Sequence, residues 1–159
     1  MFIRKKIYIG ILFIGTVLFS NVSNAQMKRF DSFFGASAGA EIDNQYSVFG
    51  VNYEIELFNF GPGLAAVGGS MQYRNQGYTP SGNTFIIAEL IYNFSKISGG
   101  KFVPFLSAAG GSNFEFDEKY YSGQAGLRYF INEKNSLAVK YGAGKRSNST
   151  IELCYDVKL

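Results

Sequence analysis

The sequence predicts an all-β protein, an eight-stranded antiparallel up-and-down transmembrane β-barrel, on three observations. After residue 25, apolar and polar residues alternate in short stretches, as they do in β-strands with two unlike faces. Each stretch has about 10–12 residues, the length that a tilted strand needs to cross a bilayer. Aromatic residues make up 17% of the chain, and many lie near the ends of the stretches, where membrane barrels carry aromatic girdles.

The first 25 residues have the pattern of a Sec signal peptide. A basic segment at 4–6 precedes an apolar run at 7–19, and Ala25 ends a group of small residues suited to signal peptidase. The apolar run has 13 residues, fewer than the roughly 20 of a membrane-spanning helix. This length disfavours the alternative of a retained N-terminal anchor. We expect a signal peptide at 1–25 and a single barrel domain at 26–159.

Composition narrows the function classes. The chain has 15 basic and 12 acidic residues, and three of the basic ones belong to the signal peptide, so the mature balance is 12 against 12. Nothing in this balance suggests the basic patch of a nucleic-acid-binding protein. The single cysteine, Cys154, excludes a disulfide framework. We interpret it as a small buried residue, and a reactive thiol is the alternative.

Eight strands are expected in order, separated by clusters of Gly, Asn, Ser and Pro. They cover residues 30–41, 46–57, 64–74, 84–95, 102–113, 120–131, 136–145 and 150–159. The connections at 59–63, 95–101 and 132–135 should meet at one end of the barrel, and those at 42–45, 75–83, 113–120 and 145–150 at the other. Membrane barrels keep their periplasmic turns short, so the first set is assigned to the periplasm.

The strands differ in how clearly they show two faces. The first strand is rich in small residues. The fifth has apolar residues on both of its faces, and its Pro104 removes one hydrogen bond between strands. The other strands have a clear apolar face, carrying Phe49, Val51, Tyr53, Ile55 and Leu57; Ala65, Val67, Met71 and Tyr73; Ile86, Ala88, Leu90, Tyr92 and Phe94; Tyr121, Ala125, Leu127, Tyr129 and Ile131; Leu137, Val139, Tyr141 and Ala143; and Ile151, Leu153, Tyr155, Val157 and Leu159.

These apolar faces could meet lipid, or they could form the core of a soluble, lipocalin-like periplasmic binding barrel. The opposite faces combine isolated charges with many small residues. A water-facing surface would instead carry Lys and Glu at most positions, whereas a narrow lumen needs small side chains. Lipid is therefore favoured, with girdle aromatics expected at Tyr46, Tyr73, Phe85, Phe94, Tyr121, Tyr129 and Tyr155.

The signal peptide, the eight amphipathic strands and the alternating last strand "TIELCYDVKL" resemble the small OmpA/OmpX-type outer-membrane β-barrel family. The resemblance implies that 26–159 is an outer-membrane barrel domain in a Gram-negative cell envelope. It also implies a last strand that the barrel-assembly machinery reads. Tyr155, Val157 and Leu159 are the candidate assembly signal, although family members usually end in Phe and this strand ends in Leu159.

The alternation of side chains along each strand points several charged residues into the lumen, where burying an unpaired charge costs free energy. We expect a plugging charge network of Glu54, Glu89, Arg128 and Lys140, with Arg74 and Glu152 as further candidates; the alternative is a narrow ion or small-solute channel.

The chain has no histidine, which excludes Ser–His catalysis and His-based zinc sites. A pair of carboxylates, Glu54 and Glu89, could do acid–base chemistry, but a packed lumen would deny access to a substrate.

The sequence therefore predicts no enzyme, no cofactor and no metal. The expected role is envelope-structural or surface interaction by a monomer whose partners are outer-membrane lipid and lipopolysaccharide. The outer loops carry aromatic and basic residues, namely Tyr78, Phe114, Phe116, Tyr120, Lys145 and Arg146. The last two suit the phosphates of lipopolysaccharide.

Overall fold

A computed structural model describes residues 27–42, 46–76, 82–96, 101–114, 118–145 and 149–159. The strands are β1 (Ser32–Glu41), β2 (Tyr46–Phe60), β3 (Gly63–Gln76), β4 (Gly82–Asn93), β5 (Phe102–Asn113), β6 (Lys119–Phe130), β7 (Asn135–Lys145) and β8 (Thr150–Lys158). No helix among the described residues is long and apolar enough to cross a membrane. The predicted signal peptide lies outside the described residues.

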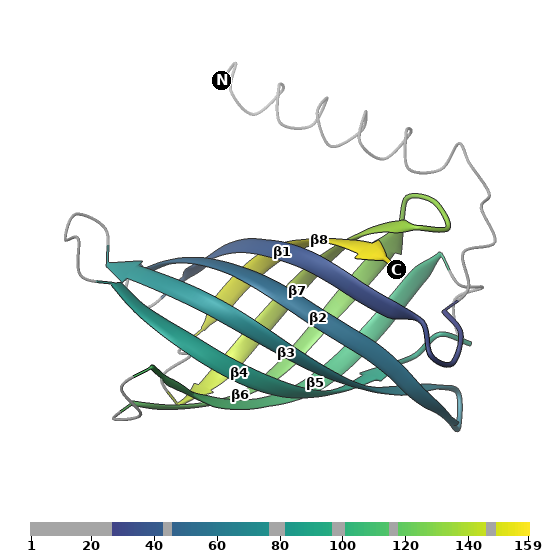
Figure 1. The fold of residues 1–159 in the computed structure, drawn as a ribbon, viewed down its shortest axis with the longest axis horizontal. Coiled ribbons are helices and arrows are strands. Elements are labelled where there is room, and N and C mark those ends of the chain that lie inside the picture. Colours follow the sequence, from purple (N-terminus) through teal and green to yellow (C-terminus); the bar gives the residue numbers. More distant parts are fainter. Residues whose placement is uncertain (1–26, 43–45, 77–81, 97–100, 115–117, 146–148) are drawn as a thin grey trace, which may run out of the picture.

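The described strands form one closed barrel in which each strand pairs antiparallel with the next, and β8 pairs with β1 (Figure 1). The predicted all-β, eight-stranded, up-and-down barrel is therefore confirmed, and the predicted strand ends agree with the structure to within three residues. The largest difference is in β2. Its pairing with β3 shifts between Glu56 and Phe58 and then continues to Phe60, beside a two-residue turn in which Gly61 has φ 55°.

Side chains alternate between the lumen and the outer wall along the strands. The pattern settles the two ambiguous strands: Phe33 and Ser37 of β1 face inward, and in β5 Phe105 is buried while Leu106 is exposed. Large exposed apolar side chains lie on all eight strands, among them Phe34, Phe49, Met71, Leu90, Leu106, Leu127, Val139 and Leu153. The apolar faces predicted from the sequence therefore lie on the outside.

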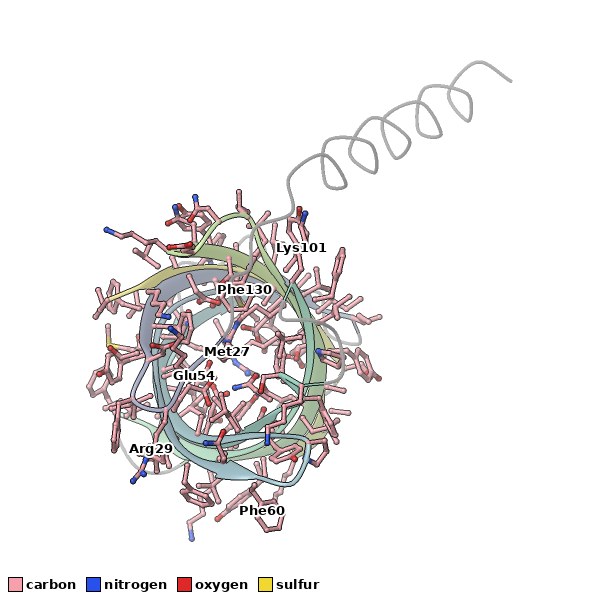
Figure 2. The ribbon with its side chains drawn as sticks, turned by 90° about the vertical axis from the view of Figure 1, so that its right-hand side faces the viewer. Met27, Arg29, Glu54, Phe60, Lys101 and Phe130 are labelled. Atoms are coloured by element: carbon pink, nitrogen blue, oxygen red, sulfur yellow. The ribbon has the colours of Figure 1, made fainter. Side chains whose placement is uncertain are left out.

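Apolar clusters fill both ends of the lumen. At the end that holds the 61–62 turn and the end of β8, Met27 and Phe33 pack with Leu64, Val103 and Phe130. Figure 2 shows Met27 and Phe130 inside the ring of strands, with Arg29 and Phe60 at its rim. At the other end the cluster is Phe85, Ile87, Ala109 and Tyr120.

Two aromatic residues therefore lie where the sequence did not predict them. Phe85 was expected in a girdle and Tyr120 in an outer loop, yet both are buried in the lumen, with ring centroids 6.2 Å apart. Those two assignments rested on nearness to a strand end, whereas alternation points both residues inward, because Ile86 and Tyr121 beside them face outward. Other aromatic residues do form contacts on the outer wall near the 61–62 turn end, namely Phe60 with Tyr92, Tyr92 with Phe94, and Phe102 with Tyr129.

Candidate functional site: a charge network in the lumen

Between the two apolar ends, the lumen contains charged side chains from seven strands. Among the described residues, the inward-facing acidic side chains are Glu41, Glu54, Glu56, Glu89, Glu152 and Asp156, and the basic ones are Arg74, Arg128 and Lys140. Strand parity explains this placement, because each of these residues is flanked by outward-facing neighbours. The network is richer in acid than the balanced set expected from the sequence.

Arg128 on β6 organises the part of the network nearest the 61–62 turn end. Its Nη1 lies 3.3 Å from Oε1 of Glu54, and its Nη2 donates to Oε2 of the same carboxylate. Its Nε lies 3.5 Å from Oδ2 of Asp156, whose Oδ1 accepts from Asn52 at 2.8 Å. The two contacts between Arg128 and Glu54 form the two-pronged geometry in which a guanidinium group binds a carboxylate most strongly. The guanidinium also lies 5.0 Å from the Phe33 ring centroid, at cation–π distance.

A second carboxylate, Glu56, lies beside Glu54. Asn93 Nδ2 donates to Oε1 of Glu54 at 2.7 Å and to Oε1 of Glu56 at 2.8 Å. Glu56 is fully buried, and its Oε2 has no hydrogen-bond partner among the described residues. Burying a carboxylate without a basic partner is costly. The two acids on β2 therefore have different surroundings, although they are two residues apart on the same face.

Lys140 on β7 organises the middle of the lumen. Its Nζ lies 3.4 Å from Glu152 Oε2 and 3.9 Å from Glu89 Oε1, and Ser70 donates to the same Glu89 oxygen at 3.3 Å. Gln72 Nε2 in turn lies 3.3 Å from Glu152 Oε2. Both acidic partners of Lys140 therefore have a further polar neighbour.

The contacts continue through Arg74 toward the end of the lumen opposite the 61–62 turn. Its Nη2 donates to Gln72 Oε1 at 3.1 Å, and its Nη1 lies 3.6 Å from Glu41 Oε2. The guanidinium also lies 4.7 Å from the centroid of the Tyr120 ring. A connected series of polar contacts thus runs from the middle of the lumen to its apolar cap.

The four residues proposed from the sequence all face inward, and the structure brings them together in pairs, Glu54 with Arg128 and Glu89 with Lys140. All four line a cavity of about 30 Å³, which holds about one water molecule. Sequence reasoning left Glu41, Glu56 and Asp156 out of the network. The alternation of the strands could have identified them, because Glu56 shares a face with Glu54, and Asp156 alternates with apolar residues of the last strand.

Other predicted residues take the positions that strand parity gives them. Tyr155 and Leu159 are exposed and Val157 is half-buried, while Tyr155 donates to Asn135 Oδ1 at 3.1 Å. Lys145 is exposed at the end of β7, and Phe114 is exposed. Tyr78, Phe116 and Arg146 lie outside the described residues. Within the described ranges, no group of three or more acidic or cysteine side chains is arranged to hold a metal ion.

No protein-family model matches the chain. No curated protein sequence matches it either. Among solved structures, it is similar to a protein from the de novo design of transmembrane β-barrels, with a TM-score of 0.68 and 15% identity over 84% of this chain and 99% of that one.

Two further solved structures overlap with the chain. The designed barrel TMB2.3, solved by solution NMR, gives a TM-score of 0.51 at 16% identity, over 82% of this chain and 94% of that one. The attachment invasion locus protein Ail of Yersinia pestis overlaps at a TM-score of 0.22 with 11% identity, over 82% of this chain and 97% of that one. The designed barrels show that the chain has the fold of transmembrane β-barrels.

Proposed function

We propose that the chain is a non-enzymatic integral β-barrel of the bacterial outer membrane, of OmpA/OmpX type, with an envelope-structural or surface-interaction role. The observation that carries the proposal is the inverted distribution of side chains. Large apolar residues are exposed on every strand, while nine charged side chains of the described residues lie inside. Soluble barrels have the reverse arrangement, and membrane barrels have this one.

The charge network supports a plugged lumen. The ion pairs and the two apolar clusters occupy the interior along the barrel axis, and the cavity among the charges measures about 30 Å³. A small-molecule site usually measures roughly 300–1,000 Å³, so this interior does not favour the lipocalin-like alternative. A narrow ion channel is the second candidate, because the one-water cavity lies in the polar part of the lumen.

The same contacts support a role without catalysis. Glu54 and Glu89, the one carboxylate pair proposed for acid–base chemistry, are each held by a different basic residue, Arg128 and Lys140. A general acid or base must reach a substrate proton, and the space between these carboxylates suits a single water.

The proposed partners follow from the outer wall and the rims. Outer-membrane lipid would surround the strands, and lipopolysaccharide phosphates would bind near Lys145, which is exposed at the outer-loop end. The outward row of Tyr155, Val157 and Leu159 would be read by the barrel-assembly machinery during insertion. The mature barrel would be a monomer.

A pair of arginine substitutions tests the membrane location. Leu153 is exposed in the middle of β8, and Ile42 is exposed just beyond the end of β1. Leu153→Arg should cost roughly 2–4 kcal/mol of folding free energy in lipid vesicles and Ile42→Arg only about 0–1, because the penalty depends on membrane depth. The measurement is urea unfolding of the refolded barrel. A protein that stays monodisperse without detergent and tolerates both changes would instead be a soluble barrel.

A further inference from the structure

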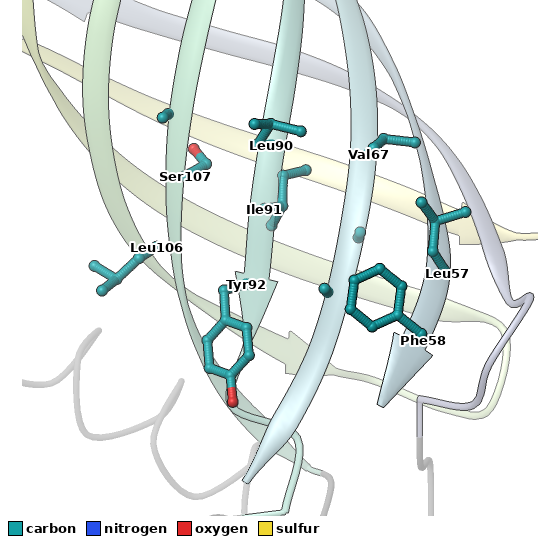
Figure 3. A pocket seen from close by; sticks show the side chains of 11 residues that line it. Leu57, Phe58, Val67, Leu90, Ile91, Tyr92, Leu106 and Ser107 are labelled. Atoms are coloured by element: carbon teal, nitrogen blue, oxygen red, sulfur yellow. The ribbon is translucent and has the colours of Figure 1, made fainter. Parts of the chain in front are cut away.

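A groove interrupts the outer wall close to the 61–62 turn. It has a volume of about 480 Å³ and crosses β2 to β5, and Figure 3 shows the lining side chains of Leu57, Phe58, Leu90, Tyr92 and Leu106. The register shift in β2 sends Leu57 and Phe58 outward in succession, which raises one side of the groove. The small side chains of Ala65 and Ala108 leave the floor of the groove open between the larger side chains.

Two basic side chains lie at the rim next to this groove. Arg29 Nε donates to the backbone oxygen of Leu57, a groove residue, at 3.0 Å, and Lys96 Nζ donates to the oxygen of Gly61 at 3.1 Å. Both side chains are exposed, and each has further N–H donors beyond these bonds. Figure 2 shows Arg29 and Phe60 on the same part of the rim, and Phe60 contacts Tyr92 of the groove.

We propose that this groove and these two cations form a binding site for an anionic glycerophospholipid of the leaflet that faces the periplasm. One acyl chain occupies the apolar groove, and the phosphate lies between Arg29 and Lys96. The inference rests on the proposed membrane location. Basic residues at membrane depth next to an apolar surface are a recurrent headgroup site, and both guanidinium and ammonium groups bind phosphate oxygens.

The charges favour lipid over a second copy of the chain as the occupant of the groove. Two copies that met through this wall would bring their Arg29 and Lys96 side chains to the same membrane depth beside one another. Like charges placed together oppose such an association. An anionic headgroup neutralises the same two charges.

The test is native mass spectrometry of the folded, detergent-purified barrel with equal amounts of phosphatidylglycerol and phosphatidylcholine of the same acyl chains. The unmodified protein should retain phosphatidylglycerol at least about fivefold better, since one basic side chain near an anionic surface contributes about that factor. The double change Arg29→Gln and Lys96→Gln should abolish the preference. Ala65→Leu, which fills the groove, should reduce binding of both lipids.

Lys134→Gln is the matched control, because Lys134 is exposed at another turn on the same end of the barrel. It should leave the preference unchanged. No preference in the folded protein, or a preference that survives the double change, would overturn the site. Dimers that disappear with Ala65→Leu would identify a second copy as the occupant and also overturn it. A chain that fails to fold as a heat-modifiable barrel in detergent would instead count against the proposed function itself.

Discussion

Replacing Glu54 by glutamine should weaken the barrel, whereas the same change at Glu56, two residues along the same strand, should not. Both side chains are buried in the lumen and both accept a hydrogen bond from Asn93. Glu54 also receives two N–H groups of Arg128, while Oε2 of Glu56 has no hydrogen-bond partner among the described residues. The two positions therefore separate the effect of an ion pair from the effect of a buried acid.

The expected magnitudes follow from these contacts. Breaking a buried ion pair costs about 3–5 kcal/mol, but Arg128 keeps Asp156 at 3.5 Å, and glutamine keeps one acceptor. We expect Glu54→Gln to lower the free energy of unfolding by about 2–4 kcal/mol, since one hydrogen bond to a charged group contributes about 1.5–3. Glu56→Gln keeps an acceptor for Asn93 and replaces a buried acid, whose Oε2 has no hydrogen-bond partner among the described residues, by a neutral side chain of nearly the same shape. Its unfolding free energy should therefore stay unchanged or rise.

The assay is urea unfolding of each variant refolded into vesicles. The chain has no tryptophan, so the folded fraction is measured by the mobility of unheated samples on SDS gels. Glu133→Gln, at an exposed turn position, controls for the loss of a negative charge and should have no effect. Equal losses for Glu54→Gln and Glu56→Gln would refute the pairing of Arg128 with Glu54 as the source of the difference.

Three further predictions concern the lumen. Gly126→Ala should destabilise the barrel by about 1–3 kcal/mol because its Cβ would meet the ring of Phe105, whereas Gly123→Ala, with open space around it, should be neutral or slightly stabilising in the same unfolding assay. Planar-bilayer recordings should show little or no steady conductance for the unmodified protein. Lys140→Ala leaves Glu89 and Glu152 without their basic partner, so it should destabilise the barrel and raise the leak conductance. A large conductance of the unmodified protein would favour the channel. Cys154 is buried, so a maleimide should label it only after unfolding, and rapid labelling of the folded barrel would show that the lumen is open.

Alternation along the chain determined the number of strands, their approximate ends and the facing of most side chains. A strand repeats every two residues, so a local pattern such as "TIELCYDVKL" already separates Leu153 and Tyr155 from Glu152 and Asp156. The inward facing of Glu54, Glu89, Arg128 and Lys140 follows from the same rule. Two strands were ambiguous because small or apolar residues occupied both of their faces.

The tertiary structure decided which of these residues meet. Glu54 and Arg128 are 74 residues apart and lie on β2 and β6, so their contact depends on the closure and stagger of the whole barrel. The same closure brings Glu56 to Asn93 and packs Phe85 of β4 against Tyr120 of β6. The register shift at Leu57 also arises from pairing between strands. Periodicity is a property of one strand, whereas a charge network and a groove need several strands in a fixed register.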